Sequence, residues 1–285
     1  MSATLDINSV ANSWKRQPWG LWSRQVAAIL RLEVRRNFLG ARSILIYLFA
    51  FAPVLIMAAV AVGARISPKM QSDPGFVNIV FANVYEAMIL RTVVFFGCAW
   101  LFMNLFRGEV VDKSLHYYFL CPVRREVLLV GKYLSGAATS GILFTATTAM
   151  CLFFLYMTIG FGYLGTGSGI REAFSYLSIT LLGCVGYGAF FLVVGLLFRN
   201  PIIPALLGYG WEWLNFLLPP VLKKISVIHY LHSLMPVPVP EGPFAVLAEP
   251  TPAWIAIPGF AVVIVLALVF ASFRIRRMQI SYSGD

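Results

Sequence analysis

Charged residues are scarce in this chain of 285 residues. Lysine, arginine, aspartate and glutamate make up 12% of the sequence, against about 25% in typical soluble domains. Hydrophobic residues make up 59%. A soluble fold of this length cannot hide so much apolar surface, because about a quarter of the unfolded chain's surface stays exposed after folding. The composition therefore excludes an ordinary soluble protein and favours a chain that lies in a lipid bilayer.

Cysteine and histidine are also rare. The four cysteines are scattered singly and none belongs to a CxxC pair, so their spacing argues against a disulfide framework or a zinc site. His229 and His232 lie three residues apart and could share a helical face. Two histidines without a third ligand do not indicate a metal centre, and we therefore predict no metal site.

Catalytic and nucleotide-binding motifs are missing as well. The sequence contains no GxSxG, no HExxH and no paired carboxylates in a polar setting. Gly131 and Lys132 resemble the end of a phosphate-binding loop, but Glu126 stands where that motif needs glycine and Tyr133 where it needs serine or threonine. No nucleic-acid-binding motif is recognisable. We therefore predict a protein that is not an enzyme, binds no cofactor itself and has no nucleic-acid partner.

Long apolar runs predict an all-α membrane protein with six spans. A transmembrane helix needs about 20 apolar residues. The predicted spans are about 43–64, 85–106, 126–159, 173–198, 201–219 and 253–274, and residues 65–84 between the first two are predicted to be a turn-rich external connection. The third helix, if it runs over 125–159, is about 52 Å long against a hydrocarbon core of about 30 Å. Its first turns should therefore project beyond the membrane.

The basic residues predict the orientation of these spans. With alternating spans and a cytoplasmic N-terminus, sixteen of the 22 lysines and arginines fall on the cytoplasmic side. Short cytoplasmic loops carry an excess of lysine and arginine, so both termini are predicted to be cytoplasmic. The predicted organisation is a cytoplasmic leader (1–42), a transmembrane domain (43–275) and a cytoplasmic tail (276–285).

Residues 19–42 read as an amphipathic helix lying in the membrane interface. One side carries basic residues and the other carries apolar residues, a pattern typical of interfacial helices. The residues assigned to it are Trp22, Arg24, Arg31, Arg35 and Arg42. Glu33 falls on the apolar side, where it could pair with Arg36 or with another segment. The alternative is a basic leader that is simply solvated.

Residues 201–252 interrupt the pattern of regular spans. Pro201, Pro204, Gly208 and Gly210 break the fifth run, which favours a broken or re-entrant helix, and we expect an external re-entrant or loop region over about 212–252. An intramembrane carboxylate is costly and indicates function, so Glu212, with Asn215 nearby, is a candidate for a transport pathway. Alternatively, Glu212 lies at the outer interface between its two neighbouring tryptophans.

Residues 107–126, RGEVVDKSLHYYFLCPVRRE, hold seven charged side chains between two apolar runs. Together with the Gly131-Lys132 pair, they resemble the cytoplasmic loop of ABC-2 type transporter permeases. In that family an acidic residue precedes a Thr/Ser-Leu pair, an apolar pair, a Pro-Val/Ile-x-Arg and then a Gly-Lys at the start of the third span. Those places are filled by Glu109, Ser114, Leu115, Leu120, Pro122, Val123, Arg124 or Arg125, Gly131 and Lys132. The aromatic run at 116–119 departs from that pattern and puts the individual partner contacts in doubt.

This resemblance implies a cytoplasmic coupling helix at about 109–121 that docks on a separate ATP-binding subunit. ATP and magnesium would be bound by that subunit, and a second permease copy, identical or paralogous, would complete the assembly. The predicted contacts are Glu109, Asp112, Ser114, Leu115, Phe119, Leu120, Pro122, Arg124 and Arg125. Leu115, Phe119 and Leu120 form an apolar face, and Pro122 should end the helix at the residue before it.

The expected function is thus an ATP-driven exporter's permease subunit in the cell membrane, with a bacterial inner membrane as the expected location. An intramembrane enzyme acting on lipid through Glu212, His229 and His232 is one alternative. A membrane scaffold or sensor that transports nothing is another. An ATP-binding subunit that purifies with the chain would distinguish the first from the other two.

Overall fold

The computed structural model describes residues 19–40, 43–66, 73–111, 123–198, 200–217, 219–239 and 252–277. All regular structure within these ranges is helical, which confirms the predicted all-α class. Arg42 and most of the predicted coupling helix, residues 112–121, lie outside the described residues, as does Pro122.

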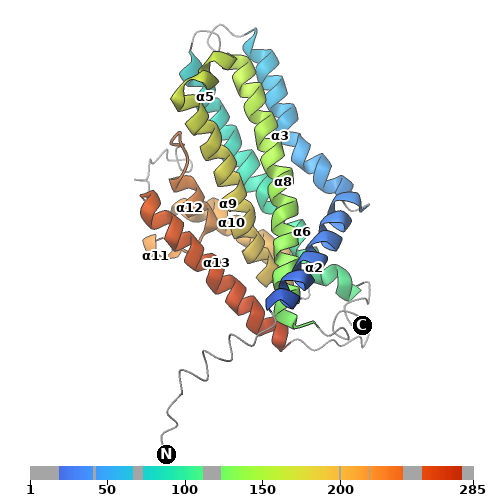
Figure 1. Ribbon diagram of the computed structural model, residues 1–285. Helices are drawn as coiled ribbons and strands as arrows, with labels where there is room; N and C mark the ends of the chain where they lie inside the picture. Colours follow the sequence, from blue (N-terminus) through green and yellow to red (C-terminus); the bar gives the residue numbers. More distant parts are fainter. Residues whose placement is uncertain are drawn as a thin grey trace, which may run out of the picture.

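Long helices form the body of the molecule (Figure 1). They are α2 (Trp19–Leu39), α3 (Ser43–Ala64), α8 (Arg125–Ile159), α9 (Gly167–Leu197) and α13 (Ala253–Arg276). A further continuous helix is built from α5 (Pro74–Val84), the π-helical turn η1 (Tyr85–Val94) and α6 (Phe95–Val111). The short elements are η2 (Phe161–Gly165), α10 (Ile202–Trp213), η3 (Leu214–Leu217), α11 (Pro220–Lys223) and α12 (Val227–Ser233).

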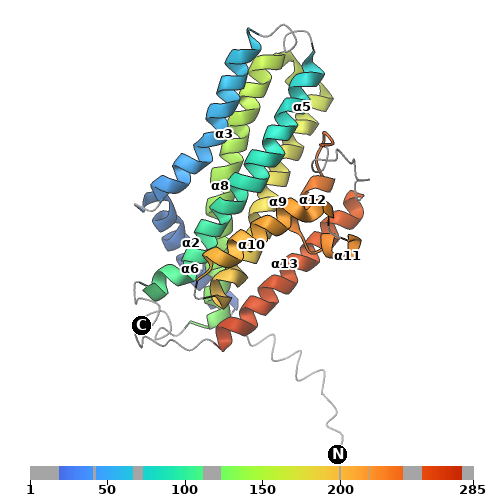
Figure 2. The same ribbon diagram turned by 180° about the vertical axis from the view of Figure 1, so that it is seen from behind.

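Five helices in the described residues are long and apolar enough to cross a membrane: Ser43–Ala64, Gly75–Phe106, Arg125–Ile159, Gly167–Leu197 and Ala253–Arg276. They correspond to five of the six predicted spans. The sixth predicted span, 201–219, is not among them. The helix in that segment, α10, has 12 residues and is about 18 Å long. That is too short for a hydrocarbon core of about 30 Å. Figures 1 and 2 place α10, α11 and α12 partway along the bundle.

The second span begins earlier than predicted. Residues 74–84 are helical, although the sequence predicts a turn-rich connection over 65–84. Asp73 accepts hydrogen bonds from the backbone N–H groups of Gly75 and Phe76, at 2.9 and 3.3 Å, and Pro74 occupies the first helical turn. Aspartate at the cap and proline just after it start a helix, so these residues mark a helix start and not a loop.

Close approach of α6 and α9 depends on glycine. A Cβ atom built on Gly188 of α9 would lie 2.4 Å from the ring of Phe102, and Phe102 is fully buried. Small residues let membrane helices approach each other in this way. The contact places α9 against α6 along the middle of the bundle.

Gly188→Ala is expected to destabilise the protein by about 1–3 kcal/mol, the usual range for overpacking a buried contact. Gly63→Ala is the matched control, because Gly63 is also helical and a Cβ there meets nothing within 4 Å. Thermal unfolding in detergent measures both variants. Equal midpoints for the two would contradict the close α6–α9 contact.

Candidate functional site

The start of α8 is held in place by three neighbouring side chains. The Arg124 guanidinium lies 4.7 Å from the centre of the Trp22 ring on α2. Arg125 donates to the backbone carbonyls of Ile275 and Arg276, at 3.2 and 2.9 Å, and Glu126 forms an ion pair with Arg276. These contacts, named here the α8 clamp, join the start of α8 to both α2 and the end of α13.

The α8 clamp begins three residues after the predicted coupling helix, about 109–121. Of the predicted partner contacts, Arg124 and Arg125 are part of it. Glu109 falls in the last turns of α6, and the others lie outside the described residues: Asp112, Ser114, Leu115, Phe119, Leu120 and Pro122. The start of α8, which follows this segment in the chain, is held by contacts with α2 and α13.

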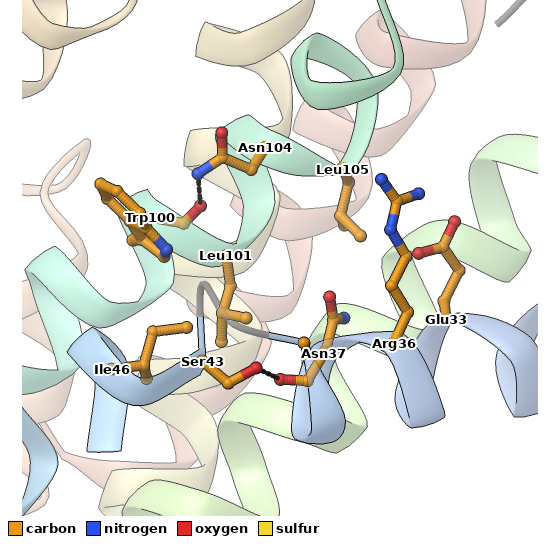
Figure 3. A pocket seen from close by; sticks show the side chains of 10 residues that line it. Glu33, Arg36, Asn37, Ser43, Ile46, Trp100, Leu101, Asn104 and Leu105 are labelled. Carbon is orange, nitrogen blue, oxygen red and sulfur yellow. Dashed lines mark hydrogen bonds between the residues drawn. The ribbon is translucent and has the colours of Figure 1, made fainter. Parts of the chain in front are cut away.

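A buried ion pair connects α2 to α8 about two turns further along, and its glutamate, Glu33, lines the cavity between α2 and α6 that Figure 3 shows. The Lys132 ammonium lies 2.6 Å from Glu33 Oε1 and donates to the Leu105 carbonyl of α6 at 3.0 Å. Lys132 is fully buried and Glu33 is 2% exposed. The partner of Glu33 is thus a residue from another segment, one of the two alternatives that the sequence left open.

Apart from Arg42, the residues assigned to the interfacial helix also lie on α2, where Leu21 and Leu32 are exposed as well. Arg24, Arg31 and Arg35 are exposed and Trp22 is half-buried. The side opposite the arginines packs along α8, where Gly131 admits the side chain of Ile29. The apolar face of α2 therefore lies against protein along this stretch, and its arginines face outward.

Glu212 is buried at the end of α10, and both of its carboxylate oxygens accept hydrogen bonds. Its carboxylate accepts hydrogen bonds from the Ser226 hydroxyl at 2.7 Å and from the N–H groups of Val227 and Ile228 at 3.2 and 3.0 Å. The Tyr187 hydroxyl is 3.4 Å away. Burial raises the pKa of this carboxyl, and these hydrogen bonds together with Arg91 lower it in part. Glu212 thereby joins α9, α10 and the start of α12.

A second ion pair lies beside Glu212. Arg91 donates to Glu86 Oε1 through two nitrogens, at 3.0 and 2.8 Å, and to the Glu212 backbone carbonyl at 2.7 Å. Its guanidinium lies 5.3 Å from the Trp213 ring. We name Glu86, Arg91, Tyr187, Glu212 and Ser226 the Glu212 cluster. Within the described residues the Asn215 amide oxygen is also buried, without a hydrogen-bond partner.

The sequence did not identify Glu86 and Arg91 as a pair. Residues five apart point about 140° away from each other on a regular α-helix, so α-helical periodicity separates them. Both lie in the π-helical η1, where i→i+5 hydrogen bonds bring this spacing onto one side. The one signal in the sequence was that Glu86 and Arg91 carry opposite charges within an otherwise apolar run, which indicates that they need partners.

Glu212→Leu is expected to lower the stability of the protein substantially. Each buried donor left without an acceptor costs about 1–3 kcal/mol, and three well-aligned donors lose theirs. Glu212→Gln, which keeps one acceptor, and Ser226→Ala, which removes one donor, should each cost less. Thermal unfolding midpoints in detergent test this order, and a Glu212→Leu variant as stable as the native chain would contradict it.

Neither a metal-ligand cluster nor a known relative identifies the function of these residues. Among the described residues no group of three His, Cys, Asp or Glu side chains could hold a metal ion. No protein-family model matches the chain, and no curated protein matches its sequence. The clusters at Glu33–Lys132 and Glu212 and the α8 clamp are therefore interpreted from their geometry.

Proposed function

We propose that the chain is the membrane-embedded permease subunit of an ATP-driven ABC-2 type exporter. A separate subunit binds ATP and magnesium, and two permease copies and two such subunits form the transporter. It resides in the cell membrane, with both termini in the cytoplasm. Residues 109–121 form the coupling helix that receives the movement of the ATP-binding subunit.

The α8 clamp is the observation that carries this proposal. A displacement of residues 112–122 reaches Arg124 and Arg125 directly, and these side chains are joined to α2 and α13. Lys132 then joins the same helix to α6 through the Leu105 carbonyl. Packed side chains and rigid helices transmit movement between distant sites in this way. One force at the start of α8 is thus shared by four helices.

The segment 201–239 serves, in this proposal, as a broken element that enters the membrane without crossing it as one helix. Non-helical backbone at membrane depth needs its polar groups satisfied by protein. Glu212 provides acceptors for Val227 and Ile228, and Arg91 donates to the Glu212 carbonyl. Polar backbone groups at this break thus have hydrogen-bond partners within the protein, which supports the re-entrant arrangement.

Purifying the chain from its native membrane under mild conditions tests the function. We expect a Walker-motif ATPase subunit to purify with it in equal amount, and the complex to hydrolyse ATP. Purification without any ATP-binding subunit would overturn the proposal. Lipid turnover by the chain alone that is lost on Glu212→Gln would instead support an intramembrane enzyme. The structure gives that role no support, because four donors already occupy the Glu212 carboxylate.

A further inference from the structure

The helix that runs from α5 to α6 departs from α-helical geometry at its middle. The ten residues of η1 (Tyr85–Val94) form a π-helix, although π-helices in proteins are rare and mostly limited to a single turn. Residues 85–94 contain neither glycine nor proline, and the alanine, leucine, methionine, arginine and glutamate among them are good α-helix formers. The local sequence therefore does not explain the π-helical form, and side-chain contacts must hold it.

Two side-chain contacts within η1 span five residues. Arg91 donates to Glu86 Oε1 through Nε and Nη2, at 3.0 and 2.8 Å, and the Thr92 hydroxyl donates to the Ala87 carbonyl at 2.8 Å. This spacing matches the i→i+5 register of a π-helix. In an α-helix a threonine can bond to a carbonyl three or four residues back instead, but Glu86 and Arg91 would point about 140° apart. The ion pair is therefore the contact that favours the π-helical form.

Arg91 also joins η1 to the end of α10, which crosses this helix in Figure 2. Its Nη1 donates to the Glu212 backbone carbonyl at 2.7 Å, and its guanidinium lies 5.3 Å from the centre of the Trp213 ring. One guanidinium thus contacts both η1 and the end of α10. A displacement of the end of α10 acts directly on the side chain that pairs with Glu86.

A return of η1 to α-helical geometry would turn α5 relative to α6. An α-helix advances 100° per residue, so a change of one residue in register turns α5 by about that angle and moves each of its residues to the place of the residue before it. Val77, which is 2% exposed, would take the place of Phe76, which is 41% exposed. Asn83, which is exposed, would take the place of the buried Ala82. The two helical forms therefore expose different residues of α5.

Tyr85 fixes the present orientation of α5. Its hydroxyl donates to the Tyr176 carbonyl of α9 at 2.8 Å and lies 2.9 Å from the Thr180 hydroxyl of the same helix. These bonds would be broken by a turn of α5. They oppose the turn while the Glu86–Arg91 pair is intact, so the π-helical form is the resting form.

We propose that η1 is a two-state switch between π-helical and α-helical geometry. The Glu86–Arg91 pair holds the π-helical form, and withdrawal of the Glu212 carbonyl and the Trp213 ring from Arg91 releases η1 to the α-helical form. A rearrangement of the end of α10 is thereby converted into a rotation of α5. Packed elements with two discrete arrangements couple distant parts of a protein in this way. The inference concerns the helices alone and does not depend on the transporter function.

Cysteine labelling of the full chain in detergent tests the switch. Val77→Cys and Asn83→Cys are each combined with Glu86→Leu/Arg91→Met, which removes both charges of the buried pair together. N-ethylmaleimide labels the thiols, and mass spectrometry of peptides separates each position from the native cysteines. Relative to the chain with the pair intact, we expect labelling to become at least tenfold faster at Val77→Cys and at least threefold slower at Asn83→Cys. Unchanged rates at both positions would overturn the proposal. Faster labelling at both would also overturn it, because that result indicates local unfolding and not rotation.

Moving the carboxylate by one residue separates the spacing of the pair from its charge. Glu86→Leu/Ala87→Glu keeps the net charge and places an acid four residues before Arg91, a spacing at which side chains meet on an α-helix. Ala87 is exposed, so its place admits the added side chain. This variant should change both labelling rates in the same directions as the loss of the pair. Glu86→Asp is the matched control, because it keeps a carboxylate at the π-helical spacing, and it should leave both rates within twofold. Equal labelling in these two variants would show that the spacing does not select the helical form and would overturn the switch.

Discussion

Replacing Lys132 by methionine is expected to destabilise the protein by about 3–5 kcal/mol, the cost of leaving a buried charge without its partner. Glu33 would keep its carboxylate in a position that is 2% exposed, with the ammonium at 2.6 Å removed. The Leu105 carbonyl would also lose a donor at 3.0 Å. Thermal or denaturant unfolding in detergent measures the loss.

The double variant Glu33→Gln/Lys132→Met separates the cost of the unpaired charge from other effects. Without a buried charge it should recover much of the stability, because replacing both members of a buried ion pair is often close to neutral. Arg276→Met is the matched control: Arg276 also pairs with a glutamate, but its side chain is 59% exposed, and such pairs contribute about 0–1 kcal/mol. A double variant no more stable than Lys132→Met would show that Glu33 does not depend on this lysine.

Under the proposed function, replacing Leu115 by aspartate is expected to abolish both association with an ATP-binding subunit and transport. Leu115 and Phe119, four residues apart, lie on the apolar face predicted for the coupling helix, and a carboxylate buried in a docking groove is strongly unfavourable. Insertion into the membrane should be unchanged, because the residue belongs to a predicted cytoplasmic segment outside the described residues. Pull-down of the tagged chain from membranes and a transport assay measure the two effects.

Tyr117→Asp provides the matched control for that variant. It introduces the same carboxylate two residues along the chain, about 200° around an α-helix from Leu115, and should largely preserve association. Undiminished recovery of the ATP-binding subunit with Leu115→Asp would remove the docking role from this face. Equal loss with both variants would show that the segment tolerates no added charge and that the apolar face is not specific.

Local patterns in the sequence predicted the helical class and five of the spans. These features depend on periodicity and run length, which are local properties. The partner of Glu33 depends instead on a contact between residues 99 positions apart. The sequence indicated that Glu33 needed a partner, because a charge stood on an apolar face, but no local pattern could select Lys132.

The Glu212 cluster shows a second limit of sequence patterns. Proline and glycine predicted an interruption near Glu212, and the structure ends α10 at Trp213. The donors that satisfy the carboxylate come from residues 226–228, beyond a 3-10 turn and a one-turn helix. Their position depends on how these short elements fold back. The π-helical η1, which unites Glu86 with Arg91, is likewise a departure from the regular α-helical period.

The α8 clamp also has a consequence for biosynthesis. Arg125 is translated 150 and 151 residues before the two carbonyls that it contacts at the end of α13. Chains emerge from the ribosome at about 5–20 residues per second and fold from the N-terminal side first. The contacts of the α8 clamp with α2 can therefore form early, whereas its contacts with α13 wait until almost the whole chain has been made. A truncated product that lacks the end of α13 would keep the Arg124–Trp22 contact and lose the other half of the clamp.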